Sequence, residues 1–184
     1  MIAITGSIGT GKSTVCKIIR SMGFKIVDCD NIVHHLYLED YIINQVKEIF
    51  PSAIVKNQID KKKLGNIIFN DLKAKKMLEN LIHPYVRAEL EKLNDNIFVE
   101  VPLLYESNME DLFDIVICVA CDDILQIKRV MERNKINAKD ARNIINNQID
   151  IKEKIKLADY TIYNNGDMNQ LIKDTKELIQ RIAK

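Results

Sequence analysis

"MIAITGSIGTGKSTV", residues 1–15, joins a short apolar run to a glycine-rich loop and to the start of a helical pattern. The run at residues 1–5 is typical of a buried parallel strand. Gly6–Ser13 fits G-x-x-x-x-G-K-[ST], the pattern of a loop that binds phosphate. The apolar residues that follow have helical spacing, and Gly23 stands where such a helix would end. The chain therefore begins as strand, phosphate loop and helix.

The loop pattern specifies a chemistry through its residue types. Glycines allow a tight turn that aims backbone N–H groups at an anion, and the helix adds the positive end of its dipole. Lys12 can reach the β- and γ-phosphates, and the Ser13 hydroxyl can ligate Mg²⁺. The alternative is a glycine-rich turn that meets the pattern by chance. The predicted nucleotide-binding residues of the loop are Gly6, Gly9, Thr10, Gly11, Lys12, Ser13 and Thr14.

The nucleotide is expected to be ATP, because the Asn-Lys-x-Asp signature of guanine recognition is absent from the sequence. An acidic residue at the end of another strand often supports the Mg²⁺ shell. Glu100, in "FVEVPLL", is the candidate here, because burying an unpaired charge among apolar residues is costly. The alternative is a solvated charge at a strand edge.

The rest of the chain alternates strands with helices. Further strands are predicted at residues 25–28, 96–101, 114–119 and 159–163, and a helix at 169–183. This alternation predicts an α/β fold, with a parallel sheet covered by helices on both faces. Two stretches interrupt it: residues 31–94, helical with no clear strand, and the polar residues 134–156. We expect both to be insertions at the carboxyl ends of strands, where such folds bind ligands.

Composition limits the classes of partner. The formal net charge of +1 gives no argument for nucleic acid or a membrane surface as a partner. The N-terminus lacks the basic region of a signal peptide, and no apolar run approaches the ~18 residues of a membrane span, so a cytoplasmic protein is expected. Four cysteines are expected to be free thiols. Cys118 and Cys121 form a C-x-x-C, read as core packing with redox or metal binding as the alternative.

Five segments together resemble the dephospho-coenzyme A kinase family in order and spacing. They are "ITGSIGTGKSTV", "VDCDNIVHHL", "IHPYVR", "VEVPLLYES" and "LADYTIYNNGD". The resemblance implies a P-loop NTPase fold of nucleoside-kinase type with a five-stranded parallel sheet. Its core would be residues 1–30, 95–133 and 157–184, its substrate-binding helical insertion 31–94, and its lid 134–156. It also implies phosphoryl transfer from ATP, with Mg²⁺, to the 3′-hydroxyl of dephospho-coenzyme A, giving coenzyme A and ADP.

The resemblance gives the acidic and substrate-side residues roles. Asp30 would be the catalytic base, or would orient the acceptor hydroxyl. Asp28 would support Asp30, the substrate or the Mg²⁺ shell, with a cap on a helix starting near Asn31 as the alternative. His83 and Arg87 would bind substrate, Arg87 by gripping a phosphate. The alternative for His83 is an ordinary residue at a helix end, held by backbone hydrogen bonds. Pro84 would occupy the first turn of a helix.

Arginines are expected to neutralise the transferring phosphoryl. Arg129 and Arg133 are four residues apart and share a helix face, where the alternative is a solvated basic stripe. Arg142 is a further predicted ATP contact. Ile144 and Ile151 stand where the family usually carries basic lid residues, so Arg142, Lys152 and Lys154 are the candidates to replace them.

Other readings stay open at this point. Tyr163, where the family has Asp, could contact the base or pack in the core. The resemblance implies a small-molecule substrate, and the oligomeric state is expected to be a monomer or a small homo-oligomer. Two rival functions are another small-acceptor kinase, such as a nucleoside monophosphate kinase, and a non-catalytic ATP-gated binding protein.

Overall fold

The computed structural model describes residues 1–93 and 97–183. Two compact units make up this chain: residues 1–28 with the chain from 97 onward, and Cys29–Leu93. Each unit is described by itself. The predicted strand 96–101 begins at a residue outside the described part. The predicted end of the insertion, at residue 94, and the predicted restart of the core, at residue 95, also lie outside the described part.

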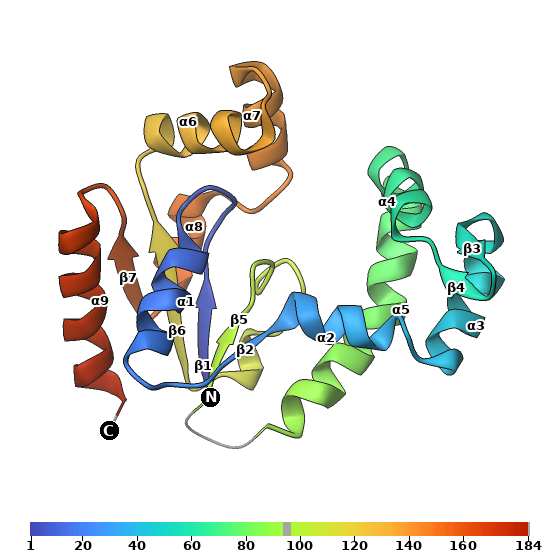
Figure 1. The fold of residues 1–184 in the computed structure, drawn as a ribbon, viewed down its shortest axis with the longest axis horizontal. Coiled ribbons are helices and arrows are strands. Elements are labelled where there is room, and N and C mark those ends of the chain that lie inside the picture. The colour runs from blue at the N-terminus through green and yellow to red at the C-terminus, as the bar shows by residue number, and fades with distance from the viewer. Residues whose placement is uncertain (94–96, 184) are drawn as a thin grey trace. The chain divides into compact units, whose positions relative to one another are not determined.

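The first unit is built on a parallel sheet (Figure 1). Its five strands lie in the order β2-β5-β1-β6-β7, and every pairing is parallel. The strands are β1 (Ile2–Thr5), β2 (Ile26–Asp28), β5 (Phe98–Glu100), β6 (Ile115–Ala120) and β7 (Tyr160–Tyr163). The prediction of an α/β fold with a five-stranded parallel sheet is confirmed.

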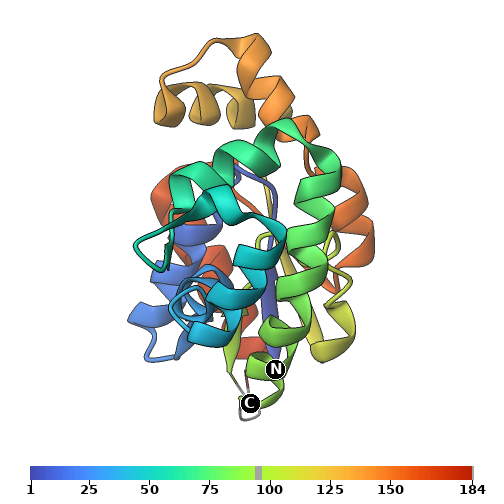
Figure 2. The same ribbon diagram turned by 90° about the vertical axis from the view of Figure 1, so that its right-hand side faces the viewer.

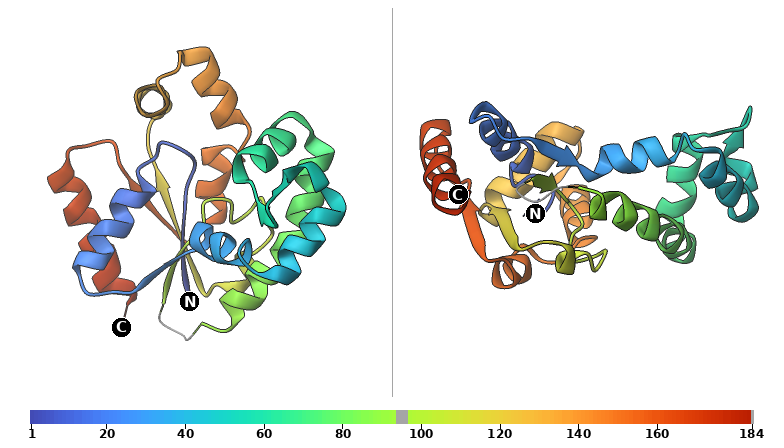
Figure 3. Two further views of the ribbon diagram at one scale, coloured as in Figure 1. Left: turned by 45° about the vertical axis from the view of Figure 1, so that its right-hand side comes forward. Right: turned by 90° about the horizontal axis from the view of Figure 1, so that it is seen from below.

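Helices cover both faces of this sheet, which is visible in the left view of Figure 3. Helices α1 (Lys12–Ser21) and α9 (Met168–Ile182) lie on one face, and α8 (Ile151–Leu157) lies on the other. The alternation of β6 explains this, because successive side chains of a strand point to opposite faces. Ile117 and Val119 enter the core beneath α1 and α9, and Cys118 and Ala120 pack against α8.

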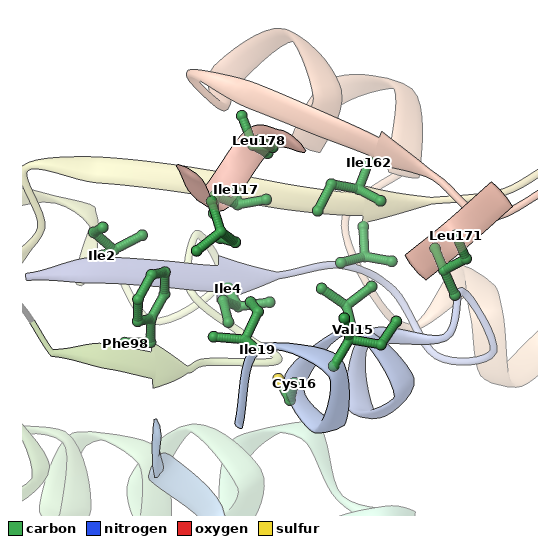
Figure 4. Close-up of a cluster of buried hydrophobic side chains, with 13 residues drawn as sticks. Ile2, Ile4, Val15, Cys16, Ile19, Phe98, Ile117, Ile162, Leu171 and Leu178 are labelled. Atoms are coloured by element: carbon green, nitrogen blue, oxygen red, sulfur yellow. The ribbon is translucent and has the colours of Figure 1, made fainter. Parts of the chain in front are cut away.

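The larger core lies between the sheet and helices α1 and α9 (Figure 4). Ile4 of β1 and Val15 and Ile19 of α1 are almost wholly buried there. Phe98 of β5 packs edge-on against Phe24 with ring centroids 5.2 Å apart. This packing fixes α1 against β1, and thereby fixes both ends of the loop that joins them.

Two helices follow the carboxyl end of β6. They are α6 (Asp123–Asn134) and α7 (Ala138–Asn146), and Lys135, at φ 53°, ends α6 in a left-handed conformation. The short 3₁₀ helix η2 (Glu110–Leu112) precedes β6. The predicted lid, 134–156, therefore contains α7 and most of α8, and its mobility stays a prediction.

The second unit is mostly helical, and its elements are blue to green in Figure 2. Its helices are α2 (Cys29–Leu36), α3 (Asp40–Ile49), η1 (Pro51–Ala53), α4 (Lys61–Asn70) and α5 (Leu72–Glu91). The absence of a strand was a wrong prediction, because β3 (Ile54–Val55) and β4 (Gln58–Ile59) form an antiparallel hairpin. Lys56 and Asn57, at φ 50° and 59°, make its two-residue turn, a conformation that suits the twist of a hairpin.

Aspartates set two helix starts in this unit. The side chains of Asp60 and Asp71 accept backbone N–H bonds at the beginnings of α4 and α5. The prediction that Pro84 lies in a first turn is wrong, because α5 begins at Leu72 and Pro84 is inside it. Packing of the buried stripe Leu78, Ile82 and Val86 stabilises the helix across a residue that lacks an N–H donor. Among the described residues, no helix has both the length and the apolar character needed to span a membrane.

Candidate active site

The loop between β1 and α1 has the backbone that an anion-binding loop needs. Gly6, Gly9 and Gly11 all have positive φ, at 146°, 81° and 95°. A Cβ on Gly11 would lie 2.0 Å from Asn164 Nδ2, and one on Gly6 would lie 2.4 Å from the Val119 carbonyl oxygen. Only glycine therefore fits these positions, for reasons of both backbone conformation and space.

The first turn of α1 places backbone N–H groups and the Lys12 side chain next to this loop, where both can attract an anion. Gly11 is the residue before the helix, no acidic side chain lies in the first turn, and Ser13 is exposed. Backbone N–H groups in a first helical turn have no partner within the helix, so they can bind an anion. Lys12 Nζ lies 3.8 Å from Glu100 Oε1, and both side chains are only 12–13% exposed.

Two carboxylates lie side by side at the carboxyl edge of the sheet. Asp28 of β2 is the direct register partner of Glu100 of β5, and Glu100 is also paired with Ile4 of β1. The ion pair with Lys12 shows that Glu100 is not the fully solvated strand-edge charge that was the alternative. Burial, together with the Glu100 carboxylate, raises the pKa of the Cys16 thiol well above its usual range. Cys16 is thus a thiol neighbour of Glu100 that holds its proton.

Asn164 is a residue of the site whose role sequence reasoning missed. It follows β7, is 8% exposed, and donates from Nδ2 to the Thr10 carbonyl at 2.9 Å. Its Oδ1 accepts from Arg129 Nη2 at 3.4 Å, so it links the phosphate loop to α6. Its position in an Asn-Asn-Gly turn at the carboxyl end of a predicted strand could have indicated a site residue, because ligands bind at such strand ends. Tyr163, beside it, is 54% exposed, which excludes core packing for that residue.

The predicted arginines differ in environment. Arg129 is partly buried, and among the described residues its Nη1 is a buried donor with no hydrogen-bond partner. Arg133, one turn later on α6, is exposed and donates from Nε to Asn134 Oδ1 at 3.1 Å. Arg142 of α7 lines a cavity of about 570 Å³ together with Asp123, Gln126 and Gln148. A buried, unpartnered guanidinium nitrogen is the kind of donor that a bound anion satisfies.

Lys154 proves to be an internal residue. Its side chain is 0% exposed, and its Nζ lies 2.8 Å from Glu106 Oε1 and donates to the Pro102 carbonyl at 3.2 Å. A buried charge needs such partners, and these leave its ammonium closed to solvent. The suggestion that Lys154 replaces a lid arginine is therefore wrong, whereas Arg142 and Lys152 remain candidates. Glu106 belongs to the "VEVPLLYES" segment, where its spacing after the strand was a signal that went unused.

The second unit carries the other predicted site residues. Asp30 is exposed in the first turn of α2, which begins at Cys29, earlier than expected. Arg87 Nε lies 3.2 Å from Glu91 Oε1. His83 lies within α5, not at a helix end as in the alternative, and partial burial lowers the pKa of its imidazole. The roles of Asp28, Asp30, His83 and Arg87 stay predictions.

The cysteines and remaining histidines occupy ordinary positions. All four cysteines are buried free thiols, and burial raises the pKa of Cys118 to about 12. This agrees with core packing for the C-x-x-C. His34 contacts the Lys61 ammonium, and His35 Nδ1 lies 2.7 Å from the Asn31 carbonyl oxygen. In residues 1–93 and 97–183, no three His, Cys, Asp or Glu side chains are grouped so that they could hold a metal ion.

Comparison with known proteins identifies the family. A family model described as dephospho-CoA kinase matches residues 1–170. The dephospho-CoA kinase of Campylobacter jejuni is 37% identical over 194 residues, covering 98% of this chain and 96% of the relative. A crystal structure of dephospho-CoA kinase from Campylobacter jejuni has a TM-score of 0.74 at 37% identity, covering 99% and 96% of the two chains. The crystal structure of TT1252 from Thermus thermophilus has a TM-score of 0.83 at 30% identity, covering 100% and 97%. With its phosphate loop, its parallel sheet and these full-length matches, this chain belongs to the dephospho-CoA kinase family.

Proposed function

We propose that this chain transfers the γ-phosphoryl group of ATP to the 3′-hydroxyl of dephospho-coenzyme A, forming coenzyme A and ADP. The observation that carries the proposal is the family match over residues 1–170 together with a phosphate loop whose glycines, Lys12 and Ser13 are all in place. A general phosphate loop would support many reactions, so the acceptor rests on the family and the donor on the loop.

The loop and α1 hold the triphosphate in this proposal. Backbone N–H groups before and within the first turn of α1 bind its oxygens, and Lys12 neutralises the β- and γ-phosphates. The 3.8 Å separation between Lys12 and Glu100 is too long for a tight hydrogen bond, so Lys12 can turn to an incoming phosphate. Arg129 adds charge through its unpartnered Nη1, and the exposed Arg133 and Arg142 supply further contacts.

The residues present also fit Mg²⁺. An exposed Ser13 hydroxyl and the neighbouring carboxylates of Glu100 and Asp28 are the hard oxygen donors that this ion prefers. Bound there with ATP, Mg²⁺ would neutralise charge that develops on the phosphate oxygens. In the proposal, Ser13 and Glu100 are the residues that would hold the ion.

Residues of the second unit act on the acceptor. Asp30 takes the proton of the acceptor hydroxyl or aligns its oxygen, and His83 and Arg87 bind the substrate. Asp30 is exposed in the first turn of α2, which supports this role. The predicted lid excludes water, which would otherwise accept the phosphoryl group. Because α8 packs on Cys118 and Ala120, we assign the moving part of the lid to α7.

The test is a transfer assay with purified protein, ATP, Mg²⁺ and dephospho-coenzyme A, in which ADP release and coenzyme A formation are both measured. Nucleoside monophosphates serve as competing acceptors, and Lys12→Ala is the inactive control. Coenzyme A formation that is lost in Lys12→Ala is the expected result. If a nucleoside monophosphate were phosphorylated faster than dephospho-coenzyme A, the proposed acceptor would be wrong and the nucleoside monophosphate would take its place. ATP binding without transfer to any acceptor would favour a binding protein instead.

A further inference from the structure

Two glutamine side chains hydrogen-bond to the backbone of one residue of the phosphate loop, Ile8. Gln148 Oε1 accepts the backbone N–H of Ile8 at 2.8 Å, and Gln126 Nε2 donates to the Ile8 carbonyl at 2.8 Å. Gln126 lies on α6 and is 2% exposed, and Gln148 lies between α7 and α8. Both polar groups of the Ile8 backbone are thus satisfied by side chains that come from distant parts of the chain. We call Gln126, Gln148 and Ile8 the glutamine clamp.

The clamp rests on a buried anchor. Ile149, next to Gln148, donates its N–H to Glu106 Oε1 at 3.0 Å, and its carbonyl oxygen lies 3.5 Å from Ser7 Oγ. Glu106 in turn pairs with the fully buried Lys154. The backbone on the C-terminal side of Gln148 is therefore fixed on both of its polar groups, so the Gln148 amide is held in place when it meets Ile8.

Ile8 stands directly before Gly9, which has a left-handed φ of 81°. A glycine-rich loop has many accessible conformations, and each one that turns the N–H groups away from the phosphate lowers the apparent affinity. Fixing the Ile8 peptide groups limits that freedom before any ligand arrives. Neither glutamine needs to touch the nucleotide to have this effect.

We propose that Gln126 and Gln148 are positioning residues that hold the phosphate loop in its anion-binding conformation through Ile8. The proposal rests on the proposed function, because it takes ATP as the ligand of the loop. It predicts a specific division of effects: affinity for the nucleotide depends on the clamp, and affinity for the acceptor does not.

The variants are Gln148→Met, Gln126→Met and the double variant, because methionine keeps the length of the side chain without its amide. Asn147→Met is the matched control, since Asn147 is the exposed neighbour of Gln148.

ATP binding is measured by calorimetry, and the KM for dephospho-coenzyme A by transfer assay. Each single clamp variant should bind ATP about tenfold more weakly, the effect of losing one bond to a buried group. The double variant should bind ATP only slightly more weakly than the single variant with the lower ATP affinity, because both bonds restrain the same residue. The control should match the unsubstituted protein.

A second measurement needs no ligand. Hydrogen exchange of the Ile8 amide, followed by NMR on the nucleotide-free protein, should speed up in Gln148→Met and stay slow in Gln148→Glu, which keeps an acceptor oxygen. Unchanged Ile8 exchange in Gln148→Met overturns the clamp. So does a parallel loss of affinity for ATP and dephospho-coenzyme A, which would indicate a merely structural role. If the unsubstituted protein bound no ATP, the proposed function would fail, while Ile8 exchange would still decide whether the clamp exists.

Discussion

The close approach of Asn164 to the phosphate loop predicts the outcome of Gly11→Ala. The new Cβ would lie 2.0 Å from Asn164 Nδ2, so the Asn164 side chain must leave its place. Alanine at the φ of 95° found at Gly11 costs roughly 1–2 kcal/mol. Moving Asn164 breaks its 2.9 Å bond to the Thr10 carbonyl, and a buried group left without a partner costs roughly 1–3 kcal/mol. The free energy of unfolding should therefore fall by about 2–5 kcal/mol, the sum of these two costs.

The assay is urea unfolding followed by circular dichroism, without nucleotide, on Gly11→Ala, Asn164→Ala and the double variant. Asn164→Ala alone should lose about 1–3 kcal/mol. The double variant should be as stable as Gly11→Ala, because the alanine at 11 has already broken the bond that Asn164 makes. Gly65→Ala is the control: Gly65 lies inside α4 with nothing within 4 Å of its added Cβ, and alanine there should stabilise by ~0.5–1 kcal/mol.

Two results would refute this reasoning. One is a loss for Gly11→Ala smaller than about 1 kcal/mol, which would mean that the backbone tolerates alanine there. The other is additivity of Gly11→Ala and Asn164→Ala to within about 0.5 kcal/mol, which would mean that the two residues do not meet.

Three further predictions concern catalysis, the buried pair and pH. Asp30→Asn should lower kcat by about 100-fold or more while the calorimetric Kd for ATP changes little, and near-normal turnover would remove Asp30 as the base. Lys154→Met should destabilise by about 3–5 kcal/mol in urea unfolding because it leaves the Glu106 carboxylate unpaired, and adding Glu106→Gln should restore much of that loss. The lowered pKa of His83 means that the unfolded chain binds the proton more tightly. The contribution of neutral His83 to the free energy of unfolding is therefore fully present above the ordinary pKa of 6.5, and it is lost as the pH falls below that value. The Tm of His83→Gln should accordingly fall less than that of the unsubstituted protein between about pH 8 and about pH 5, and equal falls would contradict the assignment.

Local patterns were enough to predict the five strands of the first unit and its first and last helices, whereas α7 and most of α8 lie in residues 134–156, where no helix was predicted. Each predicted strand overlaps an observed one, because the strands of a covered parallel sheet are short runs rich in apolar and β-branched residues. The second unit was harder. The hairpin at residues 54–59 is held by a turn of Lys56 and Asn57, which lacks the glycine that usually marks such a turn. Pro84 misled the prediction of a helix start, because tertiary packing of α5 outweighs the loss of one hydrogen bond.

The phosphate loop shows what the sequence by itself determined. Its glycines, Lys12 and Ser13 define a local backbone and a local charge, so the pattern contains the chemistry within eight consecutive residues. The supports of that loop were decided only by the tertiary structure. Asn164 lies 154 residues from Thr10, and Gln148 lies 140 residues from Ile8. Neither contact follows from a spacing, because each depends on where the sheet brings strand ends and loops together. The same physics placed Lys154, whose charge suggested a phosphate contact, in the interior beside Glu106.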